Sequence, residues 1–187
     1  MPKDPTIAQA RNLEDAFFAK ENAKLLEKLR EKAQREERRA ALRVVIRNAD
    51  DATIDHLLDL GIRPETALAV ALVPLAAVAW ADGTLDDRER DAILRAAEDR
   101  GVHAGTPARE MLESWLARAP GPQLITAWKH YVASVWSDLS AHEREDLREA
   151  MIGMARRVAE AAGGFLGVRS ISAAERAVLQ DLEATLS

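Results

Sequence analysis

The most constraining feature of the sequence is a run from Thr66 to Ala81 that contains no charged residue. Its 16 residues are nearly all apolar, and charged segments bound it on both sides. A membrane-spanning helix needs about 20 apolar residues, so the run is too short for that role. A helix that is apolar on every side is typical of a protein core. The pattern predicts a central helix over residues 65–81, buried on most faces and kinked at Pro74, which removes one internal hydrogen bond.

The composition of the whole chain favours helices. Ala, Leu, Glu and Arg, which are good helix formers, dominate, whereas the residues that favour strands are sparse. Hydrophobic residues make up 48% and charged residues 30% of the chain, a balance typical of globular proteins. We therefore expect a soluble all-α protein with a compact helical bundle as its main body.

The sequence contains no cysteine, which excludes disulfides, thiol catalysis and thiolate metal sites. The first residues, MPKDPTIAQARNLEDAFF, carry acidic side chains early and lack the apolar stretch of a secretory signal. We therefore expect a cytoplasmic protein without a transmembrane segment.

Charge is divided unevenly along the chain. Residues 1–48 hold 12 Lys and Arg against 8 Asp and Glu, a net charge of +4, whereas residues 49–187 hold 14 against 23, a net charge of −9. The two parts are interpreted as a basic N-terminal helical extension and a helical bundle. An acidic body argues against nucleic-acid binding, so no nucleic-acid partner is expected.

The extension is predicted to be helical over residues 12–47, with Asn12 as its N-cap. It lacks a sustained heptad pattern, which argues against a long coiled coil. Its basic side chains could contact an acidic partner, RNA or an anionic membrane surface, the last as a peripheral contact. Because its acidic and basic residues are interspersed, a plain solvated helix fits equally well.

Glycine and proline mark the expected boundaries within the bundle. Gly61 and Gly101 each follow a predicted helix, and Thr106 with Pro107 begins another. The further helices are predicted at residues 54–60, 87–100, 106–118, 123–138, 140–162 and 172–186.

One motif at the start of a helix occurs three times. Each copy has an apolar residue, then Asp or Ser, and then Glu three residues later, which is a capping box preceded by an apolar staple residue. The pairs are Asp86 with Glu89, Ser140 with Glu143, and Ser172 with Glu175. The first and third copies also follow a helix that ends in glycine, so residues 79–94 and 160–179 are interpreted as a degenerate internal repeat.

The run VPLAAVAWADGTLDDRERDAILRAA resembles the tellurite-resistance TerB family. The resemblance rests on an apolar helix that ends in Ala-Asp-Gly, followed by a short loop and an early glutamate, here Asp82, Gly83 and Glu89. It covers roughly residues 64–187, since element boundaries are soft. It implies an all-helical bundle, a link to metal-ion or stress-response systems, and no established catalytic activity. In the second copy Gly163 stands where the first has Asp82.

The loop after the central helix is the candidate metal site. Asp82, Asp86, Asp87 and Glu89 offer carboxylate oxygens, which Ca²⁺ and Mg²⁺ prefer, although their spacing is not that of an EF-hand. The same residues also suit a purely structural role: Asp82 can accept loop N–H groups, Gly83 can adopt a positive φ, and Asp86 with Glu89 can cap the next helix. We expect no cofactor beyond weak binding of a divalent cation.

Other chemistry finds little support. His56, His103, His130 and His142 fall on four segments and form no zinc motif. The glycine-rich stretch at residues 163–167 lacks the context of a phosphate loop, so Phe165 and Leu166 are expected to pack over the end of the bundle. The four tryptophans are expected to anchor the core, with a groove for a partner as the alternative.

No catalytic constellation can be identified. We therefore expect a non-enzymatic module that acts through protein partners. The alternative is a regulator that responds to divalent cations through residues 82–89.

Overall fold

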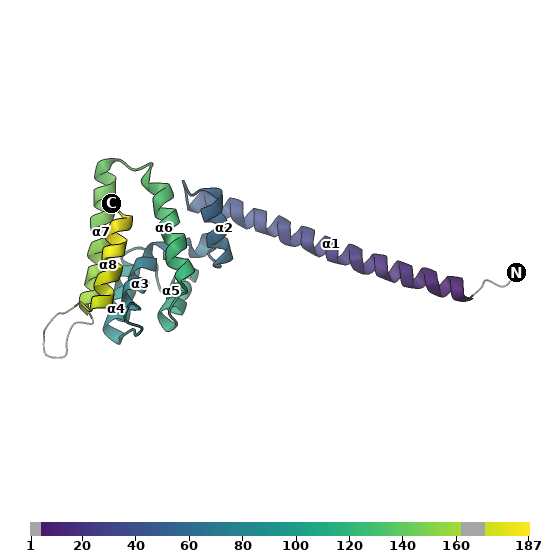
Figure 1. The fold of residues 1–187 in the computed structure, drawn as a ribbon, viewed down its shortest axis with the longest axis horizontal. Helices are drawn as coiled ribbons and strands as arrows, with labels where there is room; N and C mark the ends of the chain where they lie inside the picture. Colours follow the sequence, from purple (N-terminus) through teal and green to yellow (C-terminus); the bar gives the residue numbers. More distant parts are fainter. Residues whose placement is uncertain (1–4, 162–170) are drawn as a thin grey trace. The chain divides into compact units, whose positions relative to one another are not determined.

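Helix formers dominate the chain, and the computed structural model is accordingly mostly helical. It describes the backbone of residues 5–161 and 171–187, with side chains from residue 17 onward. Within these ranges there are helices, turns and loops but no strands, which confirms the predicted all-α class (Figure 1). The elements are α1 (Pro5–Val45), α2 (Asp51–Asp59), the 3₁₀ helix η1 (Pro64–Leu72), α3 (Val73–Ala79), α4 (Asp87–Glu98), α5 (Pro107–Ala117), α6 (Pro122–Trp136), α7 (Ala141–Ala161) and α8 (Ala173–Thr185).

The chain divides into two units, residues 1–40 and residues 41–187. The division falls before the expected boundary at residue 48 because the end of α1 belongs to the second unit. Leu42 and Ile46 are 0% and 4% exposed there. The helix also begins earlier than predicted, at Pro5 rather than after an N-cap at Asn12. Proline suits the first turn of a helix, where its missing N–H costs nothing.

The core of the second unit surrounds α3. This helix contacts η1, α4, α6, α7 and α8, and α7 and α8 lie side by side beyond it (Figure 1). Leu72, Leu75 and Val78 are 0%, 1% and 0% exposed. The prediction that the charge-free run lies buried in the centre is therefore confirmed.

The prediction of one kinked helix over residues 65–81 is wrong. Residues 64–72 form the 3₁₀ helix η1, and an α-helix begins only at Val73. Pro74 explains the boundary, because inside an α-helix its ring would clash with the carbonyl of Val70 and its nitrogen could not donate. In the first turn of α3 neither problem arises.

Helix starts in the second unit follow local capping chemistry. The α2 helix begins before the predicted residue 54 because the Asp50 side chain accepts a hydrogen bond from the Thr53 N–H at 2.7 Å. Gly61 follows this helix with φ of +80°, as predicted for a residue that ends a helix. Thr106 caps α5 through the N–H of Arg109 at 3.3 Å, which confirms that prediction.

In the described ranges no single helix is long and apolar enough to cross a membrane. Within the same ranges, α2 taken together with η1 and α3 reaches that length and composition, and the two parts meet at 94°.

Candidate functional site

The loop between α3 and α4 is held by its own acidic side chains. Asp82 Oδ1 accepts hydrogen bonds from the N–H and the hydroxyl of Thr84, both at 2.9 Å. Gly83 lies between them with φ of +90°, a conformation that side chains disfavour. The predicted structural role of Asp82 and Gly83 is confirmed.

The capping box that follows is complete. Asp86 Oδ1 accepts the N–H of Glu89 at 2.8 Å, and Glu89 Oε2 accepts the N–H of Asp86 at 3.0 Å. Asp87 lies beside this box and is exposed. Of the four predicted metal ligands, Asp82, Asp86 and Glu89 are therefore already engaged by the loop and the start of the helix.

The other two capping boxes form in the same way. Glu175 accepts the N–H of Ser172 at 2.6 Å and donates its own N–H to the Ser172 hydroxyl at 3.1 Å. The corresponding distances between Ser140 and Glu143 are 2.8 Å and 3.3 Å. The threefold motif found in the sequence is thus a real structural device at the starts of α4, α7 and α8.

These caps lead to a stability prediction. Replacing Ser140 or Ser172 with alanine should each lower the free energy of unfolding by about 1 kcal/mol, the usual cost of losing a serine N-cap. Ser114→Ala is the matched control, because Ser114 is exposed in α5 and caps no N-terminus. Urea denaturation measures all three variants. Equal stability of the Ser172 and Ser114 variants would show that the caps do not stabilise the fold.

Burial separates the three capping glutamates. Glu89 and Glu175 are 4% and 5% exposed, whereas Glu143 lies at the surface. Burial raises the pKa of Glu89 to about 7, although the hydrogen bond from the N–H of Asp86 lowers it. The charges of Asp86, Glu175 and Asp82 raise it further. The exposed Glu143 has a lowered pKa instead, because the hydroxyl and N–H of Ser140 stabilise its carboxylate.

Glu175, at the start of α8, lies near enough to Glu89, at the start of α4, for its charge to act on that carboxyl. One oxygen of Glu175, Oε1, is buried without a hydrogen-bond partner. The result is a buried carboxyl group on Glu89 whose pKa is raised to about 7. Nothing in the sequence indicated that the charge of Glu175 would act on Glu89.

A metal site at this loop stays a prediction. In the two described ranges, no three His, Asp or Glu side chains lie close enough together to hold a metal ion. The expected packing of Phe165 and Leu166 falls on residues outside the described part of the chain.

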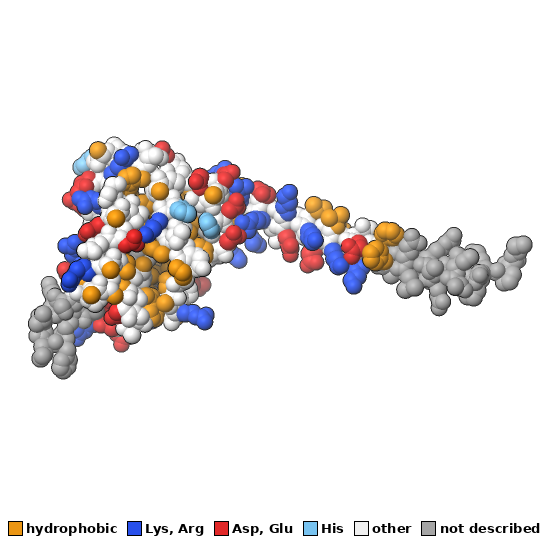
Figure 2. Space-filling model, viewed as in Figure 1, with side chains coloured by type: hydrophobic (Ala, Val, Ile, Leu, Met, Phe, Trp, Pro, Cys, Tyr) orange, Lys and Arg blue, Asp and Glu red, His pale blue; other side chains and the backbone are white. Residues whose placement is uncertain are grey.

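Two histidines that no sequence motif connects are neighbours in the structure. The rings of His56 in α2 and His130 in α6 have centroids 6.1 Å apart at the surface, which Figure 2 shows as two adjacent pale-blue side chains. They are far apart in the sequence, and no motif connects them. Only the packing of α2 against α6 brings them together.

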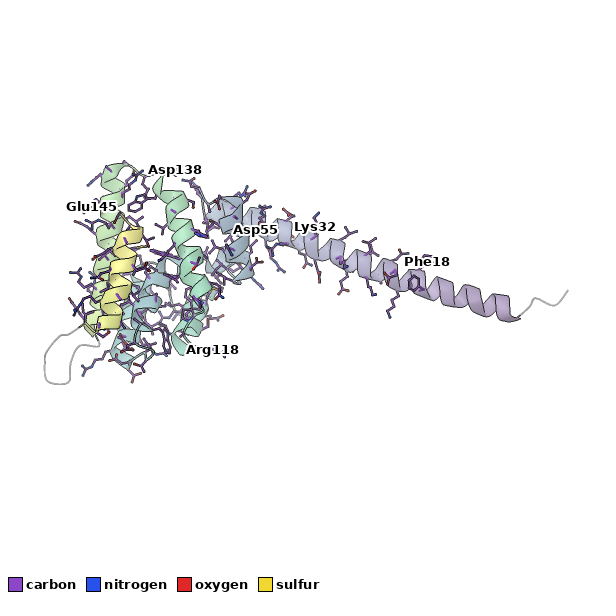
Figure 3. The ribbon with its side chains drawn as sticks, viewed as in Figure 1. Phe18, Lys32, Asp55, Arg118, Asp138 and Glu145 are labelled. Atoms are coloured by element: carbon purple, nitrogen blue, oxygen red, sulfur yellow. The ribbon has the colours of Figure 1, made fainter. Side chains whose placement is uncertain are left out.

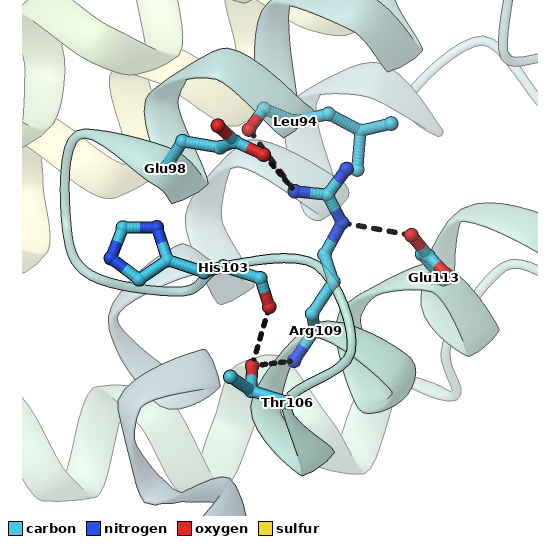
Figure 4. Close-up of polar contacts among 6 residues, drawn as sticks. All are labelled: Leu94, Glu98, His103, Thr106, Arg109 and Glu113. Carbon is cyan, nitrogen blue, oxygen red and sulfur yellow. Dashed lines mark hydrogen bonds and ion pairs between the residues drawn. The ribbon is translucent and has the colours of Figure 1, made fainter.

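Arg109 is a further residue whose role could not be predicted from the sequence. It is 8% exposed, and it joins α5 to α4 (Figure 4). Its Nε donates to Glu113 at 2.8 Å, and one terminal nitrogen lies 3.4 Å from both Glu98 and the carbonyl of Leu94. Such a buried, multiply bonded guanidinium is a structural tie.

The prediction that the tryptophans anchor the core is confirmed in part. Trp128 is 1% exposed and belongs to the core, whereas Trp80, Trp115 and Trp136 are partly buried. The indole N–H of Trp80 donates to the carbonyl of Trp115 at 2.9 Å, which ties the end of α3 to α5.

No protein-family model matches the chain, and no curated protein or solved structure is detectably similar to it.

Proposed function

We propose that this protein is a non-enzymatic, TerB-like helical module that acts through protein partners, in a metal-ion or stress response. The contact is made by the apolar face of α1, and the bundle is the folded body that carries it. The resemblance of residues 73–97 to the TerB pattern supports a role in a metal-ion or stress response. The single observation that carries the interaction is the exposure of large apolar side chains on α1.

These side chains form one stripe. Phe18, Leu25, Leu26 and Leu29 are 55%, 57%, 55% and 54% exposed. Because successive residues of an α-helix are offset by about 100°, the four fall within an arc of about 100° on one face. We call this face the apolar stripe. Figure 2 shows orange side chains along this part of α1, and Phe18 is labelled on the helix in Figure 3.

The second unit differs from α1 in how far its large apolar residues are exposed. Among the described residues of this unit, the large apolar side chains are buried or partly buried, with Val44, Val45 and Leu68 as the exposed exceptions. Contiguous exposed apolar surface on a folded protein usually marks a site of interaction. An amphipathic helix also gains most of its stability from packing its apolar face, so binding a partner would stabilise α1.

Affinity capture tests this function. The tagged full chain is compared with a Leu25→Lys/Leu29→Lys variant, in extract with and without added Mg²⁺ or Ca²⁺. We expect proteins captured by the unaltered chain to be lost with the variant, and metal to make no difference. Glu27→Lys is the control, because residue 27 lies on the helix face opposite the stripe. Identical capture by all three chains would contradict the proposal.

A divalent-cation-responsive regulator is the second candidate. The observation that favours it is the unpartnered Oε1 of Glu175 beside Glu89, a buried place where positive charge would be stabilised. Against it, Asp82, Asp86 and Glu89 already accept N–H groups, which leaves Asp87 as the carboxylate without a role in the loop or cap. A tight calcium site takes 6–8 oxygens.

We therefore expect millimolar Ca²⁺ or Mg²⁺ to leave the melting temperature nearly unchanged. A site with a micromolar dissociation constant would add about 4 kcal/mol to the free energy of unfolding at about 1 mM metal, so it could not be missed. Differential scanning calorimetry makes the comparison, with EDTA-treated protein as the reference. A large rise in melting temperature that disappears in Asp82→Asn would establish the second candidate.

A further inference from the structure

We propose that the apolar stripe of α1 binds the same stripe of a second copy of this chain, in a short antiparallel helix pair. The inference rests on the proposed function, since both use the stripe, and it names the partner. Apolar and charged residues along residues 17–36, all of which have described side chains, indicate this arrangement.

The apolar residues match one another when the two helices run in opposite directions. In one register Phe18 lies opposite Leu29 of the second copy, and Asn22 lies opposite Leu25. The two-fold symmetry repeats both contacts, so the seam has four layers. Leu26 then flanks the seam next to Ala19 of the second copy. A polar residue such as Asn22 within an apolar seam weakens the pairing but specifies its register.

Charges on the edge of the stripe agree with the same register. Glu21 and Lys28 are seven residues apart and lie on the same side of the seam. Antiparallel pairing sets Glu21 opposite Lys28 of the second copy, and symmetry sets Lys28 opposite its Glu21. Within one chain Glu21 accepts from Lys24 at 2.9 Å. Both side chains are about half exposed, at 48% and 57%, so this contact is a weak competitor.

A parallel pair would bring like charges together. In register, it would place Lys32 against Lys32 and Glu36 against Glu36 at the seam. The antiparallel register avoids both of these contacts and adds the Glu21–Lys28 pairs. Opposite charges across the seam attract, and like charges repel by similar amounts. The charge pattern therefore selects the antiparallel arrangement.

Sedimentation equilibrium of the purified full chain tests the pairing. We expect a dimer whose population rises with concentration and a monomer for Leu25→Lys/Leu29→Lys. Tryptophan fluorescence shows that the bundle stays folded, because all four tryptophans lie in residues 41–187. A monomer at every concentration overturns the proposal, as does a dimer that the stripe variant retains. A monomer that sediments with phosphatidylglycerol–phosphatidylethanolamine vesicles also overturns it, in favour of a membrane surface.

Charge exchange tests the direction of the helices. Glu21→Lys or Lys28→Glu alone should weaken the dimer about fivefold to tenfold, because two attractive contacts become repulsive. The double variant should regain most of the affinity of the unaltered chain, and Glu27→Lys should change it little. A double variant that is as weak as the single ones overturns the antiparallel register.

Introduced cysteines give a second measurement of direction. The chain contains no cysteine of its own, so each introduced thiol is unique. A mixture of Glu21→Cys and Lys28→Cys chains should oxidise to a disulfide that joins positions 21 and 28. Failure to form this disulfide, in a mixture that sediments as dimer, also overturns the antiparallel register.

The tests separate this inference from the proposed function. If the purified chain is monomeric but the stripe variant still loses captured proteins, the self-pairing fails and the proposed function stands. If the stripe variant changes neither sedimentation nor capture, both fail.

Discussion

Replacing Leu75 with alanine is expected to lower the free energy of unfolding of the bundle by about 3–4 kcal/mol. Leu75 is 1% exposed in α3, the helix that contacts η1, α4, α6, α7 and α8. The substitution removes the contacts of a leucine side chain and leaves a cavity that surrounding helices fill only in part. Urea denaturation followed by tryptophan fluorescence measures the loss in the second unit alone, because the extension contains no tryptophan.

Leu68→Ala is the matched control for this prediction. Leu68 belongs to the same charge-free run but is 55% exposed in η1, so its loss should cost about 0.5 kcal/mol or less. If the two substitutions cost the same, α3 is not the centre of the core. The comparison also tests the break at Pro74. In one uninterrupted α-helix, residues seven apart lie on nearly the same face, so these two leucines would be similarly buried.

Features decided by neighbouring residues were predictable from the sequence. A capping box needs only residues three apart, so the boxes at Asp86, Ser140 and Ser172 could be identified without knowledge of the fold. That most of residues 66–81 would be buried was equally predictable, because a run without charge has few places in a protein except its core.

Features decided by packing could not be predicted from the sequence. The sequence predicted that Pro74 would disturb the helix but not that nine residues before it would form a 3₁₀ helix. The capping pattern gave Glu143 and Glu175 the same role, yet one is exposed and the other buried. The effect of Glu175 on the pKa of Glu89 depends on how the helices pack, and periodicity carries no such information.

The pH dependence of stability follows from the buried member of these boxes. Glu89 has an ordinary pKa of 4.5 when the chain is unfolded and a pKa of about 7 when it is folded. The folded protein therefore binds the proton more tightly, and this contribution to stability is complete below pH 4.5. It is lost as pH rises through 7, because the ionised carboxylate must then stay buried near Glu175.

The Glu89→Gln variant should remove this dependence while it keeps the cap. Glutamine can still accept the N–H of Asp86, but it carries no charge at any pH. Between pH 5 and pH 8 we expect the unaltered protein to lose about 1–2 kcal/mol more stability than the variant, after allowance for solvent screening. Urea denaturation at several pH values measures both slopes.

Glu143→Gln is the matched control, because it changes the same position of the same motif at the surface. The pKa of Glu143 is lowered by Ser140, so its contribution to stability is present above pH 4.5 and is lost only as pH falls further. The slope between pH 5 and pH 8 should therefore match that of the unaltered protein, and a difference should emerge only in acid. Parallel slopes for the unaltered protein and Glu89→Gln would mean that Glu89 is ionised throughout this range. The hydrogen bond from the N–H of Asp86, which lowers the pKa of Glu89, would then outweigh the effect of burial.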